Sequence, residues 1–161
     1  MFPTELIELT NKLNSACRKN DIKIATAESC TAGLIAGCLT SVAGSSDVFE
    51  RGFNTYSNDA KSELLSIPMG MITTYGAVSR AIAIAMCEGA LKNAPVHLTI
   101  SVTGIAGPGG GTIEKPVGTV HMASARVGKP TIEESYLFDG NRDQIRLSTI
   151  KKALELMLSQ V

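Results

Sequence analysis

The spacing of apolar residues at the start of the chain predicts a helix, a strand and a second helix. Over residues 6–16, leucine and alanine recur every three or four positions, which places them on one face of a helix. Pro3 suits the first turn of this helix, and we expect the helix to end near Asn20. A short β-branched run at residues 22–26 then predicts a strand, and the small and apolar residues at 32–42 predict the next helix.

The middle of the chain continues this alternation. A turn-like segment at residues 43–47 precedes an extended run at residues 49–56, which predicts a strand. Asn58 is a candidate N-cap for a short helix that runs through Leu65. The apolar run within residues 79–93 predicts a longer helix that buries one face, although Gly89 weakens it slightly.

The second half of the chain begins with a strong strand signal. Residues 96–102 alternate and are rich in β-branched side chains, as in a central strand. Two further strands, at residues 118–125 and 133–138, are close enough in sequence to form a hairpin at the side of the sheet. Asn141 is the expected N-cap of a final helix. The apolar face of that helix comprises Ile145, Leu147, Ile150, Ala153, Leu154 and Leu158.

The order of these elements predicts an α/β fold. Alternating helices and strands favour parallel pairing, and the hairpin adds an antiparallel pair, so we expect a layered α/β sandwich with a mixed, mostly parallel sheet. The 161 residues are 44% hydrophobic and 19% charged, a balance typical of an ordinary folded domain. We therefore expect a single domain over residues 1–161.

Charge and composition exclude several classes of partner. Fifteen basic and fifteen acidic residues give a net charge of zero, so no overall field attracts nucleic acid or an anionic membrane. Tryptophan is absent and aromatic residues make up 4%, which argues against stacking platforms for single-stranded nucleic acid. No apolar run approaches the roughly 20 residues of a membrane span, and the first residues are acidic rather than basic. We expect a cytoplasmic protein that acts on a small molecule.

The cysteines do not indicate a metal site. Cys17, Cys30, Cys38 and Cys87 form no C-x-x-C pair and have no histidine at a zinc-site spacing. Three of them lie among apolar residues in predicted helices, where small buried thiols are common. We therefore expect reduced cysteines and no structural metal.

The segment TAESCTAG at residues 26–33 carries the clearest candidate for chemistry. It places Ser29 between the end of a strand and the start of a helix, where free backbone N–H groups and the helix dipole favour negative charge. The N–H groups of Cys30 and Thr31 could hold the oxyanion formed when a serine attacks a carbonyl. Alternatively, Ser29 or Thr31 only caps the helix. Glu28 could orient a catalytic group or complete a hydrogen-bond network beneath the turn.

A second segment, YSNDAK at residues 56–61, offers a base for Ser29. If Asn58 caps the helix, Lys61 lies in its first turn, where the helix dipole and burial both lower the pKa of an amine. A neutral Lys61 could accept the Ser29 proton, while the Tyr56 hydroxyl orients the amine or relays a proton. The alternative is a solvated lysine and a half-buried tyrosine.

A third segment, TGIAGPGGGTIEKPVGTV at residues 103–120, is rich in glycine and directly follows a strand. Such a loop can direct backbone N–H groups at an anion, but it matches neither the Rossmann nor the P-loop pattern. A flexible surface turn is the alternative. Arg142, at the start of the last helix, could bind a phosphate with two hydrogen bonds or simply be exposed. His97 is interpreted as structural, and His121 is a weaker candidate for the site.

These segments resemble the nicotinamide-nucleotide amidase family, also known as the carboxy-terminal domain of the competence/damage-inducible protein CinA. The strings TAESCTAG, GSS at residues 44–46, YSNDAK and GIAGPGGGTIEKPVGTV follow in family order and spacing. The resemblance implies a Ser29 nucleophile assisted by Lys61 and Tyr56, and deamidation of nicotinamide mononucleotide to nicotinic acid mononucleotide without a cofactor. The expected substrate contacts are Glu28, Cys30, Thr31, Thr103, Gly104, Gly107, Gly109, Gly110 and Arg142.

Two alternatives to this mechanism stay open. Cys30 could be the nucleophile, since a thiol at a helix N-terminus is acidified. The chain could also be a nucleotide-binding regulatory module that performs no catalysis. The sequence likewise leaves open whether copies of the chain assemble into a homo-oligomer.

Overall fold

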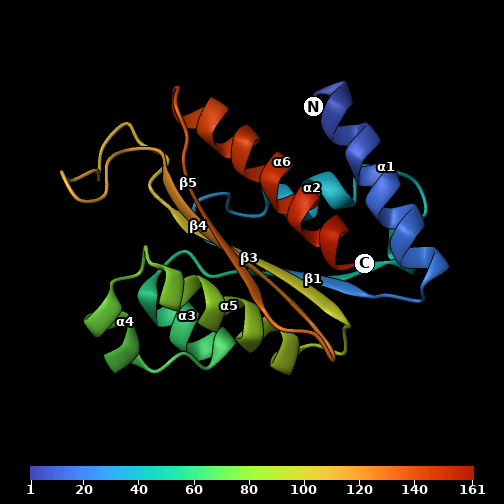
Figure 1. The fold of residues 1–161 in the computed structure, drawn as a ribbon, viewed down its shortest axis with the longest axis horizontal. Coiled ribbons are helices and arrows are strands. Elements are labelled where there is room, and N and C mark those ends of the chain that lie inside the picture. The colour runs from blue at the N-terminus through green and yellow to red at the C-terminus, as the bar shows by residue number, and fades with distance from the viewer.

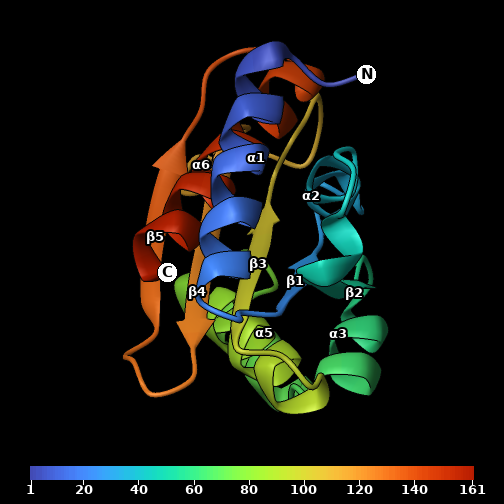
Figure 2. The same cartoon turned by 90° about the vertical axis from the view of Figure 1, so that its right-hand side faces the viewer.

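The computed structural model describes all of residues 1–161 and arranges six α-helices and five strands in three layers (Figures 1 and 2). One face of the sheet is covered by α1 (Thr4–Lys19), α2 (Leu34–Leu39) and α6 (Arg142–Gln160). The other face is covered by α3 (Asn58–Leu65), α4 (Met69–Tyr75) and α5 (Arg80–Asn93). The predicted layered α/β fold is confirmed. None of the helices combines the length and the apolar composition that a bilayer-spanning segment requires.

The sheet has the strand order β2-β1-β3-β4-β5. Its strands are β1 (Ile24–Glu28), β2 (Phe49–Asn54), β3 (Leu98–Gly104), β4 (Thr119–Arg126) and β5 (Ile132–Leu137). β1 pairs in parallel with β2 and β3, whereas β4 is antiparallel to both of its neighbours. Four of the five strands therefore run in one direction, as expected for a mixed, mostly parallel sheet. The carboxyl ends of β1, β2 and β3 meet at one edge.

The two faces of the sheet are packed differently. The main hydrophobic core lies beneath α1, α2 and α6 and includes fully buried Ile24, Ile100 and Leu154. On the other face, Ile82 and Met86 of α5 pack against α3 and α4, whereas the contacts of α5 with β4 involve smaller side chains such as Ala83 and Ala123. Small side chains let the helix backbone approach the sheet closely, so polar groups of the strand reach it.

Three hydroxyl groups of β3 bind the backbone of α5 and of the turn before it. Thr99 donates to the carbonyl of Cys87 at 2.9 Å, and Ser101 donates to that of Ala83 at 2.6 Å. Thr103, at the end of the strand, donates to the Ala77 carbonyl at 2.7 Å. These bonds fix the position of α5 along β3.

Gly89 provides a second close approach on this side of the sheet. A Cβ atom at this position would lie 2.3 Å from the carbonyl oxygen of Leu65. Glycine, which slightly weakens α5 as a helix, thus allows α5 to pack against the end of α3.

Most predicted elements are present, with differences at their ends. The strand predicted at residues 22–26 begins at Ile24 and extends to Glu28. The helix predicted from Ala32 begins at Leu34, because Ala32 and Gly33 both have positive φ angles, 49° and 93°. The predicted N-cap Asn58 is wrong: the cap is Ser57, whose hydroxyl accepts from the N–H of Ala60.

The helices α4 and α6 differ in how strongly the sequence signals them. α4 was not predicted, because its seven residues include two threonines and a glycine and only Ile72 is buried. By contrast, the Asn141 cap of α6 is confirmed, and Gln144 completes a capping box with it.

Glu28 holds the start of α2. The helix has no side-chain cap of its own at Gly33, and the carboxylate of Glu28, only 1% exposed, takes that role from the end of β1. Its oxygens accept from the N–H groups of Gly33 and Ile35 at 3.0 Å and of Ala36 at 2.9 Å. The Thr31 hydroxyl adds a fourth bond at 2.6 Å.

We expect Glu28→Gln to lower the free energy of unfolding by about 2–3 kcal/mol, because a neutral amide binds the N–H groups less strongly and brings its own donors among them. For a domain of this size the melting temperature should fall by roughly 5–10 °C. Urea denaturation measures the change. Glu155→Gln, which removes a half-exposed ion pair with Lys152, is the matched control and should be nearly neutral. Equal stability of the two variants would contradict the capping role.

Candidate active site

Ser29 directly follows β1 and begins a tight turn. Its N–H donates to the carbonyl of Val102 on β3 at 3.0 Å, and its carbonyl accepts from Ala32 at 3.1 Å. The turn then passes through the two left-handed residues before α2. Backbone bonds on both sides therefore fix the Ser29 side chain at the carboxyl edge of the sheet.

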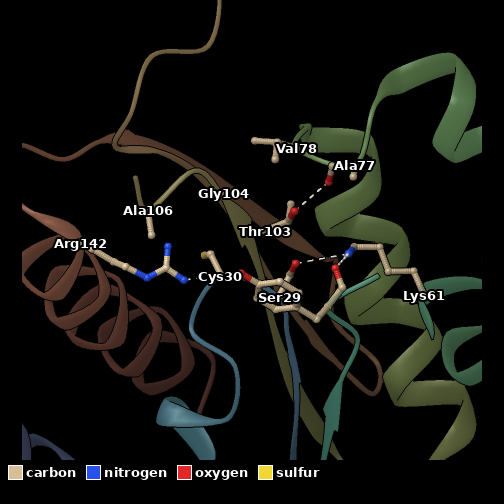
Figure 3. Close-up of a pocket in the computed structure, with 10 residues that line it drawn as sticks. Ser29, Cys30, Lys61, Ala77, Val78, Thr103, Gly104, Ala106 and Arg142 are labelled. Atoms are coloured by element: carbon tan, nitrogen blue, oxygen red, sulfur yellow. Dashed lines mark hydrogen bonds between the residues drawn. The ribbon is translucent and has the colours of Figure 1, made fainter. Parts of the chain in front are cut away.

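Lys61 approaches Ser29 from the first turn of α3. Its Nζ lies 3.2 Å from Ser29 Oγ, as the dashed line in Figure 3 marks. The same nitrogen donates to the carbonyls of Thr55 at 2.8 Å and Tyr56 at 3.3 Å. The structure thus brings together the serine and lysine predicted to act as a pair.

The surroundings of Lys61 favour an uncharged amine. The residue is only 1% exposed, and burial lowers the pKa of its amine. No carboxylate forms an ion pair with it. A neutral amine has two N–H groups and one lone pair. The two carbonyls can take the N–H groups, which leaves the lone pair for the Ser29 hydroxyl, the arrangement that a general base requires.

The N-terminus of α2 is not available to stabilise negative charge on the substrate. The Glu28 carboxylate already occupies the N–H groups of Gly33, Ile35 and Ala36 at this helix end. In the turn before the helix, the N–H groups of Cys30 and Thr31 donate to no other residue. These two groups are the remaining backbone donors beside Ser29 in the turn.

Cys30 is a poor nucleophile in this environment. It is 5% exposed, and burial raises the pKa of its thiol to about 12. Because the thiolate is the reactive form, the geometry favours Ser29 over Cys30. A helix N-terminus would lower the pKa of the Cys30 thiol, but burial has the larger effect and raises it.

A cavity of about 220 Å³ opens beside Ser29. Figure 3 shows Arg142 and Lys61 entering it from opposite sides, with Ser29 and Cys30 between them. No carboxylate lines the cavity, and with Lys61 uncharged its charged side chain is Arg142. Its walls are formed by Ser29, Cys30, Tyr56, Lys61, Ala77, Val78, Thr103, Gly104, Ala106 and Arg142.

Several predicted contacts lie outside this cavity. Glu28 and Thr31 turn beneath the nucleophile toward α2, and their side chains bind each other. Gly109 and Gly110 are exposed and do not line the cavity. Gly107 also lies outside the lining, and its carbonyl accepts from Arg142 at 2.7 Å. Of the glycine-rich segment, only its first residues reach the site.

Sequence reasoning missed the apolar part of the cavity wall. Ala77 and Val78 come from the turn before α5, and Ala106 comes from the loop after β3. Small apolar residues carry no chemical signal in a sequence. Their role depends on the Thr103 bond to Ala77, a contact between segments 26 residues apart.

Tyr56 lies at the mouth of the cavity and is 61% exposed. Its carbonyl, rather than its hydroxyl, contacts Lys61. The hydroxyl lies 3.5 Å from the guanidinium of Arg142. Tyr56 therefore contacts Lys61 through its backbone carbonyl and Arg142 through its side-chain hydroxyl.

The histidines lie away from this site. His97 accepts from the N–H of Lys23 through Nδ1 at 3.0 Å, which agrees with its structural interpretation. His121 forms a hydrogen bond with Ser135 at 2.7 Å and does not line the cavity. No cluster of three or more His, Cys, Asp or Glu side chains is arranged to hold a metal ion.

Comparison with known proteins identifies relatives over the full chain. The chain is 41% identical over 160 residues to nicotinamide-nucleotide amidohydrolase PncC of Escherichia coli K12, covering 99% of this chain and 97% of that protein. A CinA-like protein of Geobacter sp. M21 is 45% identical over 159 residues, but the chain spans only 38% of its length.

Solved structures show the same fold. A competence/damage-inducible protein from Agrobacterium tumefaciens superposes with a TM-score of 0.96 at 44% identity, covering 99% of this chain and 97% of the other. A CinA superfamily protein from Escherichia coli has a TM-score of 0.92 at 28% identity, with coverage of 100% and 94%. The model of the CinA C-terminal domain matches residues 6–161. The chain therefore belongs to the CinA C-terminal domain family.

Proposed function

We propose that this chain is an amidohydrolase that converts nicotinamide mononucleotide and water into nicotinic acid mononucleotide and ammonia. The observation that carries the proposal is the buried Lys61 amine, 3.2 Å from Ser29 Oγ and without a carboxylate partner. The name of the Escherichia coli relative supports this substrate. No metal or organic cofactor takes part in the proposed reaction.

The first half of the reaction forms an acyl-enzyme. Lys61 accepts the proton of Ser29 as the serine oxygen attacks the carboxamide carbon. The N–H groups of Cys30 and Thr31 stabilise the oxyanion. When the tetrahedral intermediate collapses, the C–N bond breaks and the departing nitrogen takes the proton from Lys61, so that ammonia leaves and an ester to Ser29 remains.

The second half releases the acid. Lys61, again neutral, accepts a proton from water as the water oxygen attacks the ester carbon. The C–O bond to Ser29 then breaks, the serine oxygen regains a proton from Lys61, and the carboxylic acid leaves. In this proposal the Tyr56 carbonyl keeps the amine oriented through both halves, and its side chain borders the entrance.

The charge of the cavity supports a phosphorylated substrate. The carboxamide lies at Ser29 in this proposal, and the ribose and phosphate extend toward Arg142 at the other side. One N–H of the guanidinium already donates to Gly107, which holds the group in place while other N–H groups stay available for phosphate oxygens.

Incubation of the purified protein with nicotinamide mononucleotide, nicotinamide riboside and nicotinamide should release ammonia fastest from the mononucleotide. Ser29→Ala should reduce turnover by at least about 1,000-fold and still bind the substrate, because only the nucleophile is lost. Cys30→Ala should retain most of the turnover. Wild-type ammonia release from Ser29→Ala would contradict the proposal, and binding without ammonia release by the wild-type protein would favour a non-catalytic nucleotide-binding module.

The value of kcat/KM for the mononucleotide should rise with pH as one group loses a proton. The rising limb belongs to Lys61, whose protonated form is inactive, and burial should place its midpoint below the ordinary lysine pKa of about 10.4. Lys61→Met should lose both turnover and this limb. Tyr56→Phe keeps the backbone carbonyl and should keep the limb. A pH-independent rate across the neutral and alkaline range would exclude Lys61 as the base.

Arg142→Met should raise KM for the mononucleotide by about 10- to 100-fold, since one or two charge-assisted hydrogen bonds to phosphate are lost. The KM for nicotinamide riboside, which has no phosphate, should change much less. Arg18→Met, which alters an arginine paired with Asp47 outside the cavity, is the control and should leave both substrates unaffected. An equal loss for both substrates would show that Arg142 does not recognise the phosphate.

A further inference from the structure

A second arginine of α6 contacts the turn that carries the nucleophile. Arg146 lies one helical turn after Arg142 and is half-buried. Its Nη2 donates to the carbonyl of Thr31 at 3.0 Å. The C-terminal helix thus binds directly to a segment 115 residues earlier in the chain, two residues after Ser29.

The turn after Ser29 is bound by a carboxylate, that of Glu28, and by a guanidinium, that of Arg146. The Glu28 carboxylate binds its donors, namely the Thr31 hydroxyl and the first N–H groups of α2. Arg146 binds an acceptor, the Thr31 carbonyl, which also receives the N–H of Leu34 at 3.1 Å. Between these contacts lies Ala32 with a φ of 49°, an unfavourable conformation for alanine that persists only where neighbouring contacts impose it.

The Arg146 guanidinium has an incomplete set of partners. Its Nε is buried and has no hydrogen-bond acceptor. The one hydrogen bond that the guanidinium makes within the protein is the bond to the Thr31 carbonyl. Its contact with Thr31 therefore points to a role in the chemistry of the adjacent turn.

We propose that Arg146 is a positioning residue for the amide hydrolysis, and that it fixes the turn so that the N–H groups of Cys30 and Thr31 point at the oxyanion. This inference rests on the proposed function. Donors of an oxyanion hole act only when they are already aligned, and a shift of about 1 Å can cost roughly 100-fold in rate. Arg146 itself does not line the cavity and makes no contact with the substrate.

The test compares Arg146→Met, which keeps an unbranched apolar stem, with Arg146→Lys, which keeps a charged donor. We expect kcat for nicotinamide mononucleotide to fall about 10- to 100-fold in Arg146→Met, while KM changes less than about threefold. Arg146→Lys should recover part of this loss. The urea midpoint of Arg146→Met should stay close to that of the wild type, since the side chain makes only one hydrogen bond and no ion pair within the protein.

Arg126→Met is the matched control. Arg126 also donates to a backbone carbonyl, that of Gln160, but lies outside the cavity and the nucleophile turn. It should leave kcat unchanged. A purely structural role for Arg146 predicts a loss of stability with normal kcat in the folded fraction, and that result would overturn the inference.

Two other outcomes also decide the question. A raised KM with normal kcat would make Arg146 a binding residue and overturn the inference. If Arg146→Met does not fold, Arg146→Gln, which removes the charge but keeps a polar side chain, decides: a reduced kcat at normal KM supports the inference, and a wild-type kcat overturns it. Failure of the proposed function would appear differently, as full activity in Ser29→Ala or as no ammonia release by the wild-type protein, and neither result depends on Arg146.

Discussion

The arrangement of the site depends on an amine buried without a counter-charge. A charged lysine would be costly at the depth of Lys61, and a carboxylate beside it would stabilise the charged amine, which could not act as the base proposed for this site. Two backbone carbonyls solve this problem, because they accept N–H groups without adding a negative charge. The segment between β2 and α3 supplies both carbonyls, so the short connection that places the lysine also controls its protonation.

Sheet topology brings the remaining groups to this amine. β1 lies between β2 and β3 and is parallel to both, so the three carboxyl ends share one edge. Ser29 follows β1, the two carbonyls follow β2, and Thr103 lies near the end of β3. Ligands of α/β proteins commonly bind at this edge. The antiparallel hairpin of β4 and β5 then returns the chain, so that α6 begins beside the same edge with Arg142.

The sequence predicts the elements and the principal groups of the site well, because their signals are local. The Asn141 cap, the alternation of helices and strands, and the positions of Ser29 and Lys61 beside helix starts depend on neighbouring residues. The role of Glu28 was left between two alternatives, since its partners lie up to eight residues away. The apolar wall and the contact from Arg146 depend on segments distant in sequence, and periodicity carries no information about them.

The Glu28 carboxylate at the N-terminus of α2 determines where negative charge is favoured beside Ser29. A free helix end attracts anions, and here it would draw the phosphate of the proposed substrate toward Ser29. The Glu28 carboxylate offsets the attraction of the helix N-terminus for anions. Negative charge is then favoured only beside N–H groups that Glu28 does not bind. In the proposed function the phosphate is attracted by Arg142, which lies on the opposite side of the cavity from Lys61. Under the proposed mechanism, this separation of the phosphate from the oxyanion gives the substrate one orientation, with its amide and not its phosphate at Ser29.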